Sequence, residues 1–209
     1  MHYPVDVLGP GHRIGIWLQG CDLACRGCVS RDTWDPEGGT STTVAALVDR
    51  IAELACGQQV DGVTISGGEP FQQPVALFEL VVAVRDRLDV ERTRPVDVMV
   101  YSGLSLGRLR EDHARILDVI DAVVPEPFIE HAGEGPLWAG SANQRVVPLT
   151  PLGVERFDAA AEITGTPRIQ MAVDDQVWMV GIPRRGDMDR LTAALAERGV
   201  VLHGASWWP

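Results

Sequence analysis

An apolar run leads directly into three cysteines in the stretch IGIWLQGCDLACRGC, residues 14–28. The first six residues, IGIWLQ, are typical of a buried strand, and the cysteines then follow at spacings of four and three. Gly20 and Gly27 allow the backbone of the cysteine segment to bend tightly. The chain has only one other cysteine, Cys56. The stretch therefore predicts a strand followed by a polar loop with a chemical task for its thiols.

The composition of the 209 residues, 45% hydrophobic and 22% charged, is that of a globular chain with one substantial core. No apolar run approaches the roughly 18 residues of a membrane span. A net charge of −11 argues against sequence-independent binding to nucleic acid. LQGC at 18–21 resembles the end of a lipoprotein signal, but Pro10 to Arg13 interrupt the apolar segment before it. We therefore expect a cytoplasmic protein with reduced thiols and with no nucleic-acid or membrane partner.

The spacing alone leaves four uses open for Cys21, Cys25 and Cys28. A disulfide leaves one thiol over, and structural zinc normally takes four ligands, often as two separated pairs. A redox dithiol uses only Cys25 and Cys28. In a 4Fe-4S cluster, three thiolates hold three irons and leave the fourth open for a substrate. The five histidines show no ligand spacing, and we expect Cys56 to be a buried free thiol.

A second motif lies in DGVTISGGEP, residues 61–70, where a short strand pattern runs into two glycines, a carboxylate and a proline. Glycines after a parallel strand let a ligand approach the main chain, and a neighbouring carboxylate can bind an ammonium group. Taken alone, GGEP is better explained as a β-turn with an exposed Glu. Its occurrence downstream of the cysteine segment favours a ligand site.

Strand and helix patterns alternate along the rest of the chain. Helices are predicted over 44–54 (capped by Thr42 or Thr43), 75–88 and 106–120, and strands over 96–101, 121–124 and 144–149. This succession predicts an α/β protein with a parallel sheet, in the form of an incomplete α/β barrel. Ligands bind beyond the carboxyl ends of such strands. The cysteine loop, GGEP and Tyr101-Ser102-Gly103 are all expected there.

Beyond Thr150 the pattern changes, and we expect three domains: residues 1–149, a linker at 150–167 and a small unit at 168–209. RIQMAV and QVWMVGI predict a hairpin, followed by a helix over 187–198 and a strand over 200–204, which together make a ββαβ extension. Two roles stay open for this extension. It either covers a sheet edge or docks a protein or peptide partner.

The pair CxxxCxxC and GGEP resembles the radical S-adenosylmethionine (SAM) superfamily. The resemblance implies a 4Fe-4S cluster on Cys21, Cys25 and Cys28, with SAM as cosubstrate. It also implies that SAM is bound by Ser66, Gly67, Gly68, Glu69, Pro70, Tyr101, Ser102 and Gly103.

Four further stretches resemble the activating enzymes of glycyl-radical enzymes, above all that of anaerobic ribonucleotide reductase. They are HYPVDVLGPGHRIGIWLQGC at 2–21, DTW at 32–34, YSG at 101–103 and PFIEHAGEGPLWAGSANQRVV at 127–147. This resemblance implies hydrogen abstraction from a glycine of a partner enzyme, with electrons from a flavodoxin-type or ferredoxin-type donor. The alternatives are a stand-alone radical SAM enzyme acting on a peptide or small molecule and, in another class, an iron-sulfur electron carrier or a zinc module.

Overall fold

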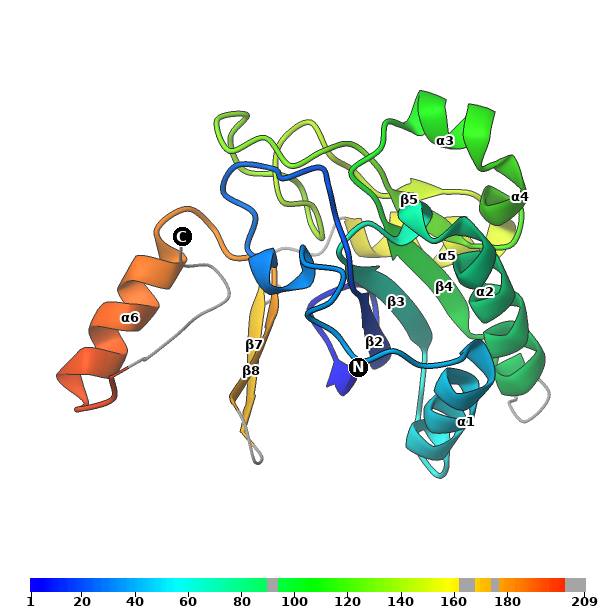
Figure 1. The fold of residues 1–209 in the computed structure, drawn as a ribbon, viewed down its shortest axis with the longest axis horizontal. Helices are drawn as coiled ribbons and strands as arrows, with labels where there is room; N and C mark the ends of the chain where they lie inside the picture. Colours follow the sequence, from blue (N-terminus) through cyan, green and yellow to red (C-terminus); the bar gives the residue numbers. More distant parts are fainter. Residues whose placement is uncertain (90–93, 162–167, 174–176, 202–209) are drawn as a thin grey trace.

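The computed structural model describes residues 1–89, 94–161, 168–173 and 177–201 (Figure 1). Its centre is a six-stranded sheet in the order β1-β2-β3-β4-β5-β6. The strands are β1 (His2–Val5), β2 (Arg13–Leu18), β3 (Gly62–Gly67), β4 (Asp97–Tyr101), β5 (Ala122–Val124) and β6 (Val147–Pro148). Strands β2 to β5 are parallel, while β1 and β6 run antiparallel at the edges. The predicted α/β class is confirmed, and the partial barrel stays a prediction.

Helices connect the parallel strands as the periodicity predicts. The helices are α1 (Val44–Ala55), α2 (Pro74–Asp89), α3 (Leu106–Asp112) and α4 (Ala114–Leu117). Thr43 caps α1, since its side chain accepts a hydrogen bond from the Ala46 N–H. The single helix predicted over 106–120 is wrong, because it is interrupted at His113. The backbone of His113 is not helical, and its ring packs against Phe71 with 5.2 Å between ring centroids.

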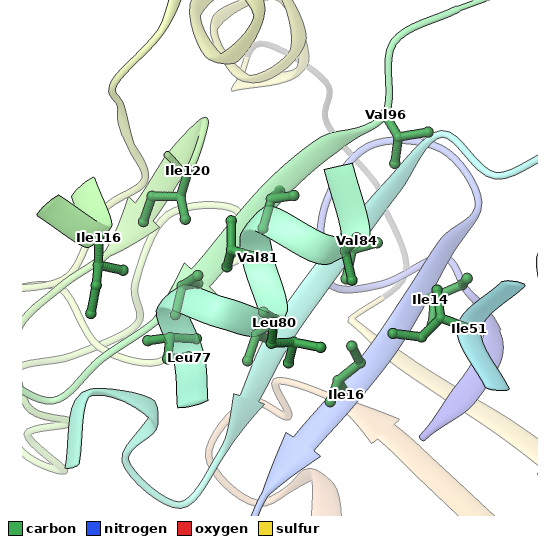
Figure 2. Packing of buried hydrophobic residues seen from close by; sticks show 14 of the residues in the cluster. Ile14, Ile16, Ile51, Leu77, Leu80, Val81, Val84, Val96, Ile116 and Ile120 are labelled. Atoms are coloured by element: carbon green, nitrogen blue, oxygen red, sulfur yellow. The ribbon is translucent and has the colours of Figure 1, made fainter. Parts of the chain in front are cut away.

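One face of the sheet forms the main apolar core with α1 and α2 (Figure 2). Alternate residues of β2, Ile14 and Ile16, point toward the helices, as expected for a strand with one face on a core. From α2, the core receives Leu77, Leu80, Val81 and Val84, all at most 2% exposed. Burying a side chain of this size contributes about 1.5–3 kcal/mol, so this layer holds the parallel strands in place.

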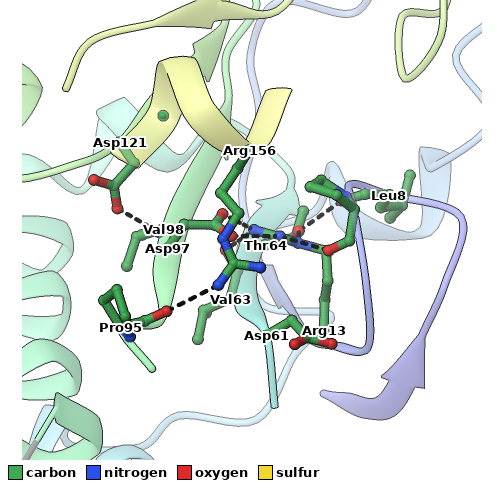
Figure 3. A network of polar contacts seen from close by, with 12 residues as sticks. Leu8, Arg13, Asp61, Val63, Thr64, Pro95, Asp97, Val98, Asp121 and Arg156 are labelled. Carbon is green, nitrogen blue, oxygen red and sulfur yellow. Dashed lines mark hydrogen bonds and ion pairs between the residues drawn. The ribbon is translucent and has the colours of Figure 1, made fainter. Parts of the chain in front are cut away.

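The opposite face of the sheet buries a polar network centred on Arg13 (Figure 3). Arg13 and Asp97 are both fully buried, and two guanidinium nitrogens donate to the two carboxylate oxygens at 2.6 and 3.1 Å. Arg13 Nε also donates to Thr64 Oγ1, and further guanidinium N–H groups donate to the carbonyls of Pro10 and Val63. The pair joins β2, β3 and β4, and such fully bonded buried pairs typically cost about 3–5 kcal/mol to break.

Part of the segment predicted as a linker, 150–167, is helical. Helix α5 (Pro151–Ala161) begins after Thr150, whose hydroxyl donates to Asp121 and accepts from the Gly153 N–H. A proline at the first helical position is favourable, so Pro151 starts the helix here. Phe157 is 2% exposed and meets Trp138 edge-on across the same sheet face that buries Arg13. Residues 162–167 lie outside the described residues, and the domain division stays a prediction.

The C-terminal extension contains the predicted hairpin, β7 (Ile169–Val173) and β8 (Val177–Gly181), followed by α6 (Asp187–Glu197). Val200 and Val201 are not in a strand, and the rest of the strand expected over 200–204 lies outside the described residues. The hairpin is attached to the main sheet, because Val180 packs in one cluster with Val5, Val7 and Leu8. In the described part of the chain, no helix is long and apolar enough to cross a membrane.

Candidate functional site

A cavity of about 430 Å³ lies at the carboxyl ends of β2, β3 and β4. This is the place where parallel α/β sheets bind ligands. All three loop cysteines line it. So do seven of the eight residues predicted to bind SAM, namely Ser66, Gly67, Gly68, Glu69, Tyr101, Ser102 and Gly103. The eighth, Pro70, is buried at the start of a short 3-10 helix (Pro70–Gln72) and does not line the cavity.

The cysteine loop is shaped by three residues with positive φ angles: Gly20, Ala24 and Gly27, at 103°, 47° and 80°. The DTW segment holds the start of this loop. The N–H groups of Gly20 and Cys21 donate to the carbonyls of Thr33 and Trp34, at 2.8 and 3.0 Å. Gln19 adds side-chain hydrogen bonds to the carbonyls of Asp32 and Asp35. DTW therefore fixes the backbone from which the cysteines project.

The two glycines of GGEP let the cysteine loop approach closely. The space that a side chain would need at either glycine is occupied by neighbouring backbone atoms. A Cβ on Gly67 would clash with the Leu18 carbonyl, and one on Gly68 with the Gly20 carbonyl. The N–H of Gly68 donates to Leu18 O at 2.8 Å, and the N–H of Glu69 donates to Gly20 O at 2.9 Å. The glycines thus join β3 to the loop after β2, a contact that their sequence pattern did not predict.

Glu69 connects the GGEP segment to the loop after β4. Its side chain is buried, and one carboxylate oxygen accepts hydrogen bonds from the Phe71 N–H and the Ser102 hydroxyl, both at 3.0 Å. The other oxygen accepts from the Gly103 N–H at 2.7 Å. Burial raises the pKa of Glu69, and these three hydrogen bonds oppose that rise. The Glu69 carboxylate therefore joins the GGEP segment to the loop after β4 at the cavity wall.

The other residues of the YSG segment also have defined contacts. The Tyr101 hydroxyl donates to the Trp138 carbonyl at 2.8 Å, and burial raises the pKa of Tyr101 well above its usual value. A Cβ on Gly103 would clash with the side chain of Leu23, in the cysteine loop. All three loops at this end of the sheet are consequently packed against one another.

The environments of the thiols differ from that of a free cysteine in water. Burial raises the pKa of the Cys21 and Cys25 thiols. Backbone hydrogen bonds from Leu23 and Ala24 to Cys21, and from Phe128 to Cys25, act in the opposite direction. Among the described residues, no three Cys, His, Asp or Glu converge on a point where one metal ion would bind. A cubane cluster does not need such a point, because each thiolate binds a different iron.

Several cavity residues were missed by the sequence analysis. Trp17 and Phe128 contribute aromatic surface, and Gln144 lines the cavity while donating to the Glu126 carbonyl. Six consecutive residues from β8 and the segment after it, 178–183, form a further part of the wall. The sequence offered a strand pattern for the hairpin, but nothing in it indicated the cavity.

Cys56 is exposed, so the expectation of a buried thiol is wrong. It follows the last residue of α1 and has an extended backbone. The fourth cysteine is thus separate from the cavity that the other three line.

Comparisons with known proteins agree with this geometry. Residues 7–147 match the family model described as a 4Fe-4S single cluster domain. The anaerobic ribonucleoside-triphosphate reductase-activating protein of Vibrio cholerae is 32% identical over 148 residues, covering 68% of this chain and 92% of that protein. The protein of the same name from Escherichia coli is 30% identical over 151 residues, covering 69% and 94%. That of Haemophilus influenzae is 31% identical over 149 residues, covering 68% and 92%.

The chain belongs to this family of 4Fe-4S activating proteins, which are radical SAM enzymes. The resemblance seen in the sequence is confirmed, as are the enzyme class and the two cofactors, a 4Fe-4S cluster and SAM.

Proposed function

We propose that this protein cleaves SAM reductively at a cluster held by Cys21, Cys25 and Cys28, and that it then removes a hydrogen atom from a glycine of a glycyl-radical enzyme. The names of the relatives favour an anaerobic ribonucleotide reductase as that enzyme. One observation carries the proposal: the three loop cysteines, the first three residues of GGEP and all of YSG line the same cavity. The incomplete α/β barrel remains the proposed form of the fold.

The residues present fit a cluster with three protein ligands. All three thiols are partly exposed to the cavity, and backbone N–H groups point at two of the sulfurs, as is common around iron-sulfur centres. Phe128 lies against Gly27 of the same loop and lines the cavity. An apolar side chain beside a cluster limits the access of water, and limiting water access is one way in which a protein tunes the reduction potential of the cluster.

A cluster held by Cys21, Cys25 and Cys28 would supply the electron for reductive cleavage of SAM to methionine and a 5′-deoxyadenosyl radical, and removal of the glycine hydrogen would then give 5′-deoxyadenosine and a glycyl radical. The chain's own residues position and shield the reactants. Ser66, Gly67 and Gly68 present the end of β3 to the methionine part of SAM, and Glu69 holds this segment against Ser102 and Gly103. We propose a flavodoxin-type or ferredoxin-type protein as the electron donor.

The ligand assignment is tested by comparing Cys25→Ala with Cys56→Ala after anaerobic reconstitution. Both variants remove one thiol, but Cys25 lines the cavity and Cys56 does not, so Cys56→Ala is the control. We expect Cys25→Ala to lose the iron-sulfur absorbance and SAM cleavage, and Cys56→Ala to keep both. Retention of the cluster in Cys25→Ala together with its loss in Cys56→Ala would falsify the assignment.

The reaction is tested by adding an anaerobic ribonucleotide reductase to the reduced protein and SAM, and recording the glycyl radical by electron paramagnetic resonance. A radical signal and an equivalent amount of 5′-deoxyadenosine are expected. SAM cleavage without any glycyl radical would favour a stand-alone enzyme acting on another peptide or a small molecule. A cluster that never cleaves SAM would favour an electron carrier.

A further inference from the structure

The C-terminal hairpin lies outside the shared domain and yet forms part of its cavity. The family match ends at residue 147, whereas residues 178–183 of β8 and the segment after it line the cavity together with the three cysteines. The family domain and the hairpin therefore build one site. Any contribution of the hairpin to substrate binding would therefore be limited to proteins that have this hairpin.

The hairpin is fixed firmly enough to act as a wall. The Gln170 amide donates to the Pro4 carbonyl at 2.7 Å and accepts from the Asp6 N–H at 2.9 Å. Arg168 donates to the Ala139 carbonyl at 2.8 Å. On the same face, Trp178 stacks on His2, and Val180 is 5% exposed. The side chains on this face of the hairpin therefore pack against the rest of the protein.

The outer edge of β8 is the part of the hairpin that remains for a ligand. Side chains on a strand alternate between faces, so the four consecutive lining residues within β8, Trp178 to Gly181, indicate that the strand presents its edge to the cavity. The Ile182 N–H donates to Arg168 O, so these two residues form a hydrogen-bonded pair. Such pairs alternate along an antiparallel ladder, so the next two are Val180 with Gln170 and Trp178 with Ala172. The main-chain groups of Met179 and Gly181 then point away from β7. In the described part of the chain, β8 has no other strand beside it.

We propose that this edge binds the extended main chain around the substrate glycine by strand pairing, with hydrogen bonds to Met179 and Gly181, and thereby selects the substrate. The inference rests on the proposed function, which requires a protein backbone to enter the cavity. The hairpin residues of the wall, WMVGIP, carry no charge and therefore suit a neutral main chain better than a charged metabolite. Glycine has no side chain, so it can approach the reacting group closely while its neighbours pair with β8.

A pair of proline variants tests the edge. Met179→Pro removes an N–H on the cavity edge of β8, and Met171→Pro removes the N–H of its cross-strand partner on the outer edge of β7, which does not line the cavity. The probe is a synthetic peptide carrying the radical glycine of an anaerobic ribonucleotide reductase, and the readout is its KM. One lost hydrogen bond predicts a KM about tenfold higher for Met179→Pro, with the value for Met171→Pro close to wild type. Equal KM values for the two variants overturn the inference.

A second measurement leaves the protein unchanged, so it does not depend on the folding of the variants. The same peptide is prepared with single N-methyl groups on successive residues, and binding to the wild-type holoenzyme is measured. Alternate positions next to the glycine should lose binding by about tenfold, because alternate N–H groups face a paired strand. Equal binding of all N-methylated forms overturns the strand pairing. A wild-type enzyme that cleaves SAM but never uses the peptide overturns the proposed function instead.

Discussion

At the scale of single residues, the site depends on side chains that make several contacts at once. Glu69 is 1% exposed and its carboxylate accepts three hydrogen bonds from two loops. The sequence placed Glu69 in the site as an acceptor for an ammonium group. The structure shows that much of its acceptor capacity is used by Phe71, Ser102 and Gly103. A loss of SAM binding on changing Glu69 would therefore include a structural contribution.

Glu69→Gln is expected to destabilise the protein even without cofactors. The glutamine oxygen can replace only one carboxylate oxygen, and its amide would then face the Gly103 N–H, which loses its acceptor. Leaving a buried donor unpaired costs about 1–3 kcal/mol. Chemical denaturation of the cluster-free protein measures this loss. An unchanged free energy of unfolding in Glu69→Gln would refute this structural role of the Glu69 carboxylate.

His12 supplies a residue-scale prediction about pH. Its ring nitrogen lies 2.8 Å from Asp6, and this hydrogen bond, followed by the charge of Asp6, raises the pKa of His12 above 6.5. Since the folded protein binds this proton more tightly, the pair stabilises the fold fully below pH 6.5, and the effect is lost as the pH rises through the raised pKa. Both side chains are about half exposed, so the effect on stability is small. An NMR titration should show the raised pKa and its return in Asp6→Asn.

At the scale of elements, the cysteine loop, GGEP and YSG form one packed unit at the end of the sheet. Backbone hydrogen bonds from Gly68 to Leu18 and from Glu69 to Gly20 join GGEP to the cysteine segment, and the Glu69 side chain joins GGEP to YSG. Main-chain contacts of this kind exclude side chains. The glycines of GGEP are thus required by the neighbouring loop, in addition to any role toward SAM.

Gly68→Ala should disturb the site without changing any of the three proposed cluster ligands. Its new methyl group would clash with the Gly20 carbonyl and press on Thr33 O, which are backbone atoms that cannot move independently. Overpacking of this kind typically costs about 1–3 kcal/mol. Melting temperature and iron content after reconstitution should both fall. The control is Gly107→Ala in α3, where the nearest atom is 4.0 Å away, and it should leave both values unchanged or slightly improved.

At the scale of the whole molecule, the C-terminal hairpin and the central sheet share one apolar cluster. Val5, Val7 and Leu8 come from the N-terminal segment and Val180 from β8, and all are at most 5% exposed. The Gln170 side chain adds hydrogen bonds to the backbone of Pro4, in the edge strand β1, and of Asp6, just after it. The extension thus packs beside a sheet edge and also forms a wall of the cavity.

Val180→Asp should separate the hairpin from the sheet. A charge in this cluster is unfavourable, and the protein avoids it by undocking the hairpin, which loses burial worth about 2–3 kcal/mol. Limited proteolysis should then cleave the C-terminal region faster, and the melting temperature should fall. Met171→Asp is the matched control, because Met171 is 45% exposed on the same hairpin. If both variants were cleaved at the wild-type rate, docking through Val180 would be refuted.

The sequence alone determined the chemical class of the site and most of the elements around it. Cysteine spacing, GGEP after a strand and the alternation of apolar residues are local properties, so they can be recognised without knowing which distant segments meet. Only the tertiary structure decided the bonding of Glu69, the burial of Arg13 with Asp97, the packing of α5, the exposure of Cys56 and the place of β8 at the cavity. Each of these depends on which parts of the folded chain cover one another, and local periodicity does not encode that.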